Sequence, residues 1–248
     1  METYAKNKFL ALWKHFFNNA ELPLTFQYTD APSLSEIVTP GSEPPCLIAA
    51  LVRARAGYPM TFEEKSVGCA GGKHYLGFNP NLAPHFEHFL STGLPGRVEA
   101  ERYKKTPEIV RRTIQQWPSF TAPTRYITFK RWDILEETDF PEVVVFFAEP
   151  DVLSGLFTLA GFDETMPEPT RAPFGSGCST IVTYPYLEAQ SERPRCVLGM
   201  FDVSARPYVP ANTLSFAVPM AKFETMVENM GQSFLVEKPW AAVQQRIK

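Results

Sequence analysis

The sequence predicts an α+β fold in which helices flank a mixed sheet, in a single compact unit spanning residues 1–248. Helix-like and strand-like segments follow one another without the strict alternation of a doubly wound sheet. Residues 142–148, EVVVFFA, form a continuous apolar run of strand length, typical of a central strand buried on both faces. Because the pattern changes after Pro118, two sub-lobes meeting near residues 118–124 are an alternative organisation of the same unit.

Amphipathic periodicity, together with the placement of prolines and glycines, predicts the helices. In the first of them Phe9, Trp13 and Phe17 recur at helical spacing, opposite lysines, and Pro23 ends the pattern. Proline is favoured in a first helical turn and glycine just after a helix, which sets most of the other boundaries. The predicted helices cover residues 3–19, 44–56, 84–92, 98–117 (one or two helices), 150–160, 179–186 (stopped near Pro185), 219–230 and 239 onward.

Apolar segments of strand length lie between these helices and predict the strands. The predicted strands cover residues 24–28, 61–66, 125–130, 142–148, 196–201 and 214–218. The chain contains 20 phenylalanines, so the core is expected to be rich in aromatic side chains. Each of them contributes about 1.5–3 kcal/mol when it is fully buried.

Composition and charge exclude several classes of protein. The net charge of −3, with lysines and arginines scattered among acidic residues, is not that of a nucleic-acid-binding surface. No apolar run approaches the ~18 residues of a membrane helix, and the first residues lack the apolar core of a signal peptide. We therefore expect a cytoplasmic protein with no nucleic-acid or membrane partner. Its four cysteines are then free thiols, metal ligands or reactive groups rather than disulfides.

A glycine-rich stretch around Cys69 is the strongest candidate for a functional site. Gly71 and Gly72 permit positive φ and close backbone approach, so the N–H groups of such a turn can form an anion-binding nest. Lys73 and His74 add positive potential that favours a thiolate, which makes Cys69 and His74 candidate catalytic residues. The simpler interpretation is a tight turn in which glycine is required for packing.

Two further segments carry candidate binding groups. Ser176 and Gly177 precede Cys178, which is a second glycine-flanked thiol and a further candidate nucleophile. Asp202 and Arg206 follow a predicted strand, where a guanidinium group can hold a carboxylate or phosphate and an aspartate can orient it. The alternative for this pair is an Asp–Arg contact that pins a loop.

These segments lead to one principal hypothesis and three alternatives. The principal hypothesis is a pocket for a small ligand, anionic in its simplest form, or for a cofactor, lined by the glycine-flanked cysteines with Lys73 and Arg206. The first alternative is a metal protein in which Cys46, Cys69 and Cys178 hold zinc or an iron–sulfur cluster, although their spacing matches no local metal motif. The other two alternatives are a thiol-dependent enzyme and a purely structural or interaction protein.

The same segments carry a resemblance to a known family. The residues concerned are Cys46 at the start of the alanine-rich segment 46–55, Cys69-Ala70-Gly71-Gly72, Leu76-Gly77-Phe78, Ser176-Gly177-Cys178, segment 202–206 and Val218-Pro219. On these residues the chain resembles the domain-of-unknown-function-169 family of bacteria and archaea, over roughly residues 4–247. The resemblance implies one family unit in which the cysteine and glycine segments form a recurring pattern. It implies no particular chemistry.

Overall fold

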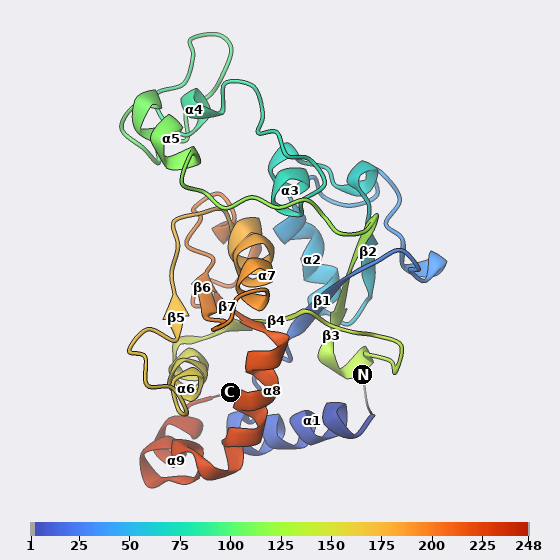
Figure 1. The fold of residues 1–248 in the computed structure, drawn as a ribbon, viewed down its shortest axis with the longest axis vertical. Helices are drawn as coiled ribbons and strands as arrows, with labels where there is room; N and C mark the ends of the chain where they lie inside the picture. Colours follow the sequence, from blue (N-terminus) through green and yellow to red (C-terminus); the bar gives the residue numbers. More distant parts are fainter. Residues whose placement is uncertain (1–2, 248) are drawn as a thin grey trace.

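A seven-stranded mixed sheet forms the centre of the computed structural model, which describes residues 3–247 (Figure 1). The strand order is β2-β3-β1-β4-β7-β6-β5, and neighbouring strands are antiparallel except for β5 and β6. The strands are β1 (Leu24–Thr29), β2 (Met60–Phe62), β3 (Tyr126–Arg131), β4 (Val143–Ala148), β5 (Thr170–Arg171), β6 (Cys196–Gly199) and β7 (Leu214–Pro219). The predicted α+β class, in one compact unit, is confirmed.

Two layers of helices cover the two faces of this sheet. One face packs against α2 (Leu47–Arg55), α3 (Ala70–Tyr75) and α7 (Tyr184–Ala189). The other face packs against helices that lie together at the bottom of Figure 1, namely α1 (Thr3–Phe17), α6 (Pro150–Ala160), α8 (Met220–Asn229) and α9 (Lys238–Gln244). Within residues 3–247, none of the helices has both the length and the apolar character that crossing a bilayer would require.

The central strand β4 shows why both faces of the sheet are covered. Its side chains alternate, so Val145 and Phe147 enter the core on the α2 face while Val144 and Phe146 enter the core on the α1 face. Every residue of this strand is buried. A strand with two buried faces needs apolar residues at each position, and this is the pattern from which the strand was predicted.

The core on the α1 face is built largely from aromatic rings. The ring centroid of Phe9 lies 5.0 Å from that of Trp132 and 5.0 Å from that of Phe223. Trp13 stacks on Phe17 with a centroid separation of 4.3 Å. Such pairs contribute about 0.5–1.5 kcal/mol beyond the area that they bury. These rings therefore hold α1 and α8 against the sheet.

Three local predictions were wrong. The glycine-rich stretch 66–78, expected as a turn, contains helix α3, because Cys69 caps its first turn. The strand expected over residues 61–66 ends at Phe62. The helix expected to stop near Pro185 instead runs from a π-helical turn, Ser179–Thr183, directly into α7. Pro185 lies in the first turn of α7, where a missing N–H group is tolerated.

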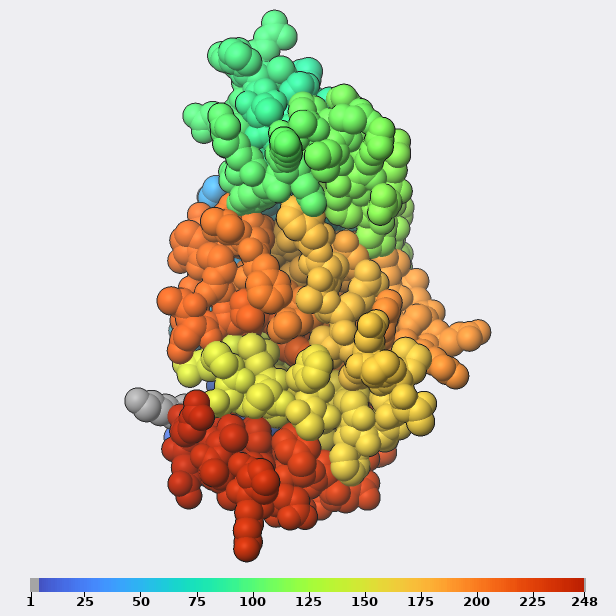
Figure 2. Space-filling view, turned by 90° about the vertical axis from the view of Figure 1, so that its left-hand side faces the viewer, coloured from blue at the N-terminus to red at the C-terminus, as the bar shows by residue number. Residues whose placement is uncertain are grey.

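Residues 79–117, which we call the cap, lie outside both cores. The cap contains α4 (Phe86–Phe89) and α5 (Pro107–Ile114), which are shorter than the helices predicted for 84–92 and 98–117. It projects from one end of the molecule (Figures 1 and 2), and none of its residues belongs to either core cluster. The rest of the described chain, which we call the body, has strands from both sides of residues 118–124 in one sheet. The cap is therefore an excursion from the body rather than one half of the chain.

The two ends of this excursion meet at Gly77. The N–H group of Ala122 donates a hydrogen bond to the Gly77 carbonyl at 2.9 Å. Gly77 has a φ of +76°, and a Cβ atom there would lie 2.6 Å from the Ala122 nitrogen and 2.8 Å from the Phe120 ring. Glycine is thus required both for the backbone conformation and for the close approach of the returning chain.

We predict that Gly77→Ala lowers the free energy of unfolding more than Gly96→Ala does. Both positions have positive φ, which costs an alanine about 1–2 kcal/mol. Nothing lies within 4 Å of a Cβ atom at Gly96, whereas overpacking at Gly77 adds about 1–3 kcal/mol. Urea denaturation followed by circular dichroism measures both variants. Equal losses would contradict the role assigned to the Gly77–Ala122 contact.

Candidate functional site

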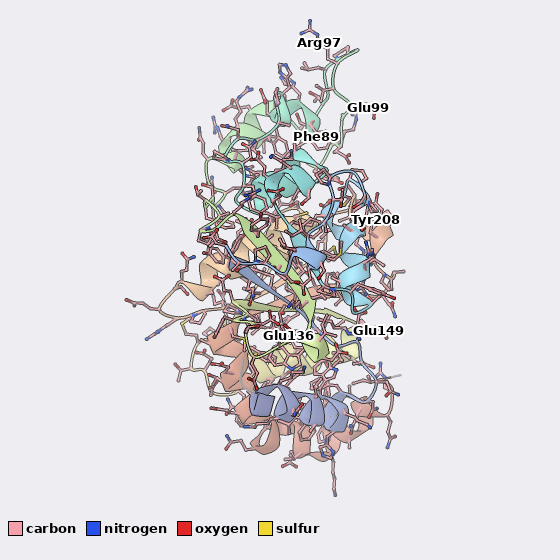
Figure 3. All side chains as sticks on the ribbon, turned by 90° about the vertical axis from the view of Figure 1, so that its right-hand side faces the viewer. Phe89, Arg97, Glu99, Glu136, Glu149 and Tyr208 are labelled. Atoms are coloured by element: carbon pink, nitrogen blue, oxygen red, sulfur yellow. The ribbon has the colours of Figure 1, made fainter. Side chains whose placement is uncertain are left out.

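A cavity of about 770 Å³ lies where the cap meets the body. From the body, residues within the four segments 45–48, 69–75, 173–178 and 201–208 line it. The cap lines it with residues between Ala83 and Trp117. Figure 3 labels one lining residue from each side, Phe89 in the cap and Tyr208 below it in the body. Small-molecule sites have volumes of about 300–1,000 Å³, so this cavity has the size of a ligand site.

The cavity brings together the cysteine and glycine segments that the sequence singled out. Cys46 directly precedes α2, Cys69 caps α3, and Cys178 directly precedes the π-helical turn. The predicted site residues that line the cavity are Cys46, Cys69, Gly71, Gly72, Ser176, Cys178 and Asp202. They come from distant parts of the chain, so only the folded protein assembles them.

Arg206, which was predicted to bind an anionic group, does not line the cavity. Its guanidinium group donates hydrogen bonds to the main-chain carbonyls of Thr213, Pro210 (3.2 Å) and Ala211 (2.6 Å). Arg206 therefore pins the loop that follows it. The guanidinium group contacts main-chain carbonyls and not Asp202. Neither the predicted anion-binding role nor the alternative Asp202–Arg206 contact therefore describes it.

Lys73 and His74 also lie outside the lining. The Nδ1–H group of His74 donates to the Asn79 carbonyl at 3.1 Å, at the base of the cap. Burial lowers the pKa of the His74 imidazole, so the ring is neutral near pH 7. Among the described residues that line the cavity there is no histidine, so the Cys–His dyad considered from the sequence is not assembled.

Cys69 is held by the helix that it begins. Its Sγ atom accepts a hydrogen bond from the N–H group of Gly72 at 3.1 Å. A Cβ atom at Gly72 would lie 3.0 Å from this sulfur and 2.8 Å from the Val67 side chain. The positive-φ glycines of the described chain do not include Gly71 or Gly72. The predicted anion-binding nest is therefore absent, and glycine serves close packing here.

Cys178 is the most buried of the thiols that line the cavity. Burial raises its pKa well above the ordinary value, and the neighbouring Cys69, Cys46 and Asp202 raise it further. Cys178 is therefore a protonated thiol at neutral pH, and a thiol is a far weaker nucleophile than a thiolate. Cys196 lies on β6 in the core on the α1 face, where burial raises its pKa to about 12.

The arrangement of these thiols does not fit the metal hypothesis. In the part of the chain that the structure describes, no group of three or more histidine, cysteine, aspartate or glutamate side chains is placed to hold a metal ion. Cys46, Cys69 and Cys178 share one cavity without forming the close ligand set that zinc or an iron–sulfur cluster requires. They give the wall a soft, polarizable surface instead.

Asp202 is the one formally charged residue among the described residues that line the cavity. Its Oδ2 atom accepts a hydrogen bond from the Gly177 N–H group at 3.0 Å. Its Oδ1 atom accepts from the N–H group and the hydroxyl of Ser204, at 3.1 and 2.8 Å. The same N–H group lies 3.0 Å from the Tyr103 hydroxyl of the cap. Asp202 is thus fixed in position at a point where the cap is tied to the body.

Most of the remaining wall is aromatic. The aromatic lining residues are Tyr75, Phe86, Phe89, Tyr103, Trp117, Phe174, Phe201 and Tyr208. Phe174 stacks on Trp117 with ring centroids 6.5 Å apart, and Trp117 meets Phe86 edge-on at 6.1 Å. None of these residues was predicted as a site residue, because scattered aromatic residues resemble core residues in a sequence. The available signal was the position of Phe174 and Phe201 directly beside the Gly-Ser-Gly-Cys segment and Asp202.

This lining does not support the expected preference for an anionic ligand. No lysine or arginine is among the described residues that line the cavity. The ammonium group of Lys104 lies 4.0 Å from the ring centroid of Phe174, but Lys104 is not part of the lining. With Asp202 as its charge, the cavity is suited to neutral or cationic groups.

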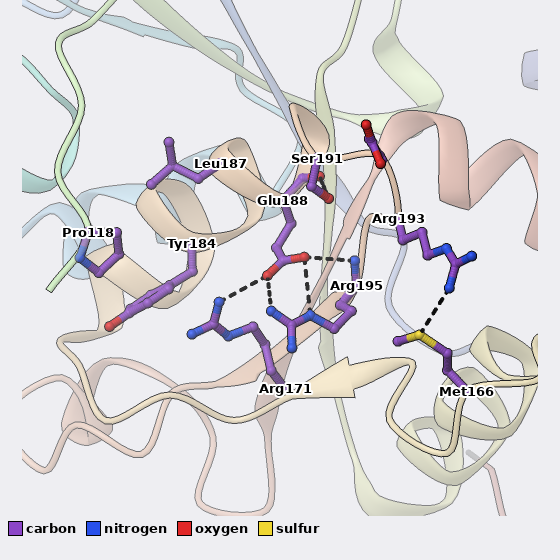
Figure 4. A pocket seen from close by; sticks show the side chains of 10 residues that line it. Pro118, Met166, Arg171, Tyr184, Leu187, Glu188, Ser191, Arg193 and Arg195 are labelled. Carbon is purple, nitrogen blue, oxygen red and sulfur yellow. Dashed lines mark hydrogen bonds and ion pairs between the residues drawn. The ribbon is translucent and has the colours of Figure 1, made fainter. Parts of the chain in front are cut away.

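A second hollow, of about 400 Å³, contains several arginines (Figure 4). The buried Glu188 carboxylate accepts hydrogen bonds from the side chains of Arg171 and Arg195, each at 2.9 Å. Burial by itself raises the pKa of Glu188, but the hydrogen bonds from Arg195 and Arg171 bring it below its ordinary value. The Glu188 carboxylate is thereby fully paired, and its two arginines join α7 to β5 and to the residue before β6, so these contacts hold the three segments together.

Comparison with known proteins places the chain in a family. The model of the DUF169 family, described as uncharacterised ArCR, matches residues 13–229. This chain belongs to the DUF169 family. No curated protein and no solved structure matches it. The matched span includes the cap and every body segment that lines the cavity, so both sides of the cavity belong to the DUF169 unit.

We predict that iodoacetamide at pH 7.5 alkylates Cys46 and Cys69 before Cys178 and Cys196. The first pair is half-buried, whereas the second pair is buried with a raised pKa and is therefore protonated at this pH. Peptide mapping by mass spectrometry measures the order, and the urea-unfolded protein is the control in which all four should react at similar rates. Alkylation of Cys178 as fast as Cys69 in the native protein would contradict this description of the site.

Proposed function

We propose that this DUF169 protein binds a small organic molecule with an apolar, ring-containing body in the cavity between cap and body. The observation that carries the proposal is the convergence of the cap and four distant body segments on one cavity with an aromatic, thiol-rich wall. Phe174, Phe201 and Tyr208 are 48%, 53% and 43% exposed, and all three line this cavity. An apolar ligand would cover them, and burial contributes about 25 cal/mol for each Å² of apolar surface.

The cysteines have the role of wall residues in this proposal. Sulfur is polarizable and makes favourable contacts with aromatic rings, so thiols suit a ring-containing ligand. A thiol-dependent reaction is less well supported, because Cys178 is protonated at neutral pH and the lining contains no imidazole among its described residues. The proposal also places the protein in a compartment that keeps these thiols reduced, such as the cytoplasm.

A purely structural role is the weaker explanation of the same features. A structural protein has no need to leave several large aromatic side chains half exposed around a hollow, because packing them would increase its stability. In a purely structural protein, the cap would be expected to pack directly on the body and cover these rings. It leaves a space of about 770 Å³ instead, which supports a binding function.

We predict that the uncharged dye Nile red binds at one site per chain and that Phe174→Ala weakens its affinity about 5- to 30-fold. The reason is the loss of a ring that contributes about 1–2 kcal/mol of contact with an apolar ligand. A fluorescence titration of the dye against each protein measures the two affinities and the number of sites.

The matched control for this prediction is Phe162→Ala. Phe162 is 44% exposed, close to the exposure of Phe174, but it does not line the cavity. Its loss should leave the affinity for Nile red unchanged, and so should dialysis against a metal chelator. Absence of saturable binding, or equal affinities in the Phe174 and Phe162 variants, would contradict the proposed function. Loss of binding after chelation would favour the metal alternative.

A further inference from the structure

Building on the proposed function, we propose that the ligand of this cavity carries a positive charge. The group would be an organic ammonium held by the Asp202 carboxylate and by aromatic rings that line the same cavity. The chemical class of the ligand is then an amine or quaternary ammonium compound with an apolar, ring-containing body. Three observations lead to this assignment: the state of the carboxylate, its influence on its neighbours, and the arrangement of the rings.

Asp202 is a carboxylate without a counter-ion. Its hydrogen-bond donors, at Gly177 and Ser204, are uncharged, and within residues 3–247 no lysine, arginine or histidine forms an ion pair with it. The buried carboxylates of Asp139 and Glu188 are each paired with a cation of the chain. A carboxylate has about four acceptor positions, and Asp202 receives three hydrogen bonds. One position and a full negative charge therefore remain for a ligand.

The charge of Asp202 reaches the other polar groups of the cavity. Burial, which is the larger cause, raises the pKa of Tyr75 and Tyr103, and the negative charge of Asp202 raises each of them further. The same two causes, in the same order, act on Cys178. Asp202 therefore acts on three groups that line the cavity, and within residues 3–247 no lysine, arginine or histidine is paired with it. A cationic ligand would neutralise it in place.

The aromatic rings that line the same cavity as Asp202 supply the second half of a cation site. The face of an aromatic ring attracts cations, and tryptophan does so most strongly. Phe174 already has the Lys104 ammonium group 4.0 Å from its ring centroid. Trp117 stacks on Phe174, and both rings line the cavity. The carboxylate and these rings come from segments that meet only at this cavity.

The test uses three probes of similar size that differ in charge. They are phenyltrimethylammonium, its neutral isostere tert-butylbenzene, and the anion benzenesulfonate, each measured by displacement of Nile red from the full-length protein. We expect phenyltrimethylammonium to bind about tenfold more tightly than tert-butylbenzene, and benzenesulfonate to bind most weakly. In the Asp202→Asn protein the affinity for the cation should fall to that for the neutral probe, whose own affinity should not change. Ser204→Ala, which removes a hydrogen bond but keeps the charge, should preserve the preference.

The outcomes separate this inference from the proposed function. The charge assignment is overturned if the cation binds no better than the neutral isostere, or if Nile red binds and none of the probes displaces it. In either case the proposed binding of an apolar ligand is unaffected. If neither dye nor probes bind, the proposed function is overturned together with the charge assignment. If Asp202→Asn fails to fold, the order of the three affinities in the unaltered protein still decides, because it depends on no variant.

Discussion

Burial of both faces of β4 is the constraint on which the rest of the structure depends. A central strand with apolar residues at every position must be covered on two sides, and the helices of the body are distributed between those two sides. Residues 79–117 have no face of the sheet left to cover. They are joined to the body by the hydrogen bond between Tyr103 and Ser204 and by the contacts that Trp117 and Lys104 make with Phe174. The Gly77–Ala122 hydrogen bond links the two body segments between which the cap is inserted. Tyr103 and Trp117 of the cap and Phe174 and Ser204 of the body all line the cavity.

The line of contact between cap and body also explains the character of the cavity. Side chains in the cores pack against the sheet, whereas much of the cavity wall comes from the cap and from loops of the body. Half-exposed aromatic rings therefore gather here, together with the Asp202 carboxylate that local N–H and hydroxyl groups hold in place. The contrast with Glu188 is informative, because that carboxylate is closed off by Arg171 and Arg195 and leaves nothing for a ligand.

The fold was more predictable from the sequence than the site was. The EVVVFFA run identified β4 because a doubly buried strand has a pattern that few other elements share. The meeting of Cys46, Cys69 and Cys178 could also be anticipated, because glycine beside each of the last two indicated close approach. The directions of Arg206 and His74 could not, since each is decided by carbonyl acceptors that only the folded loops provide.

The aromatic residues of the cap were beyond prediction for a different reason. Phe86 and Phe89 have the helical spacing of core residues, and Trp117 has it with Ile114 in the next predicted helix. A sequence does not reveal whether the apolar side of a short helix will pack in a core or line a cavity. The answer depends on how far the cap stands from the body.

Hydrogen–deuterium exchange of the amides in residues 79–117, with and without saturating Nile red, tests the central claim most directly. The claim is that the cap and body together enclose a ligand. We predict that cap amides exchange faster than those of β4 in the free protein, because the cap shares neither core. The dye should slow exchange in the cap and in residues 173–178 and 201–208 and leave β4 unchanged. Cap amides that exchange as slowly as β4, or protection by the dye only outside these segments, would contradict the claim.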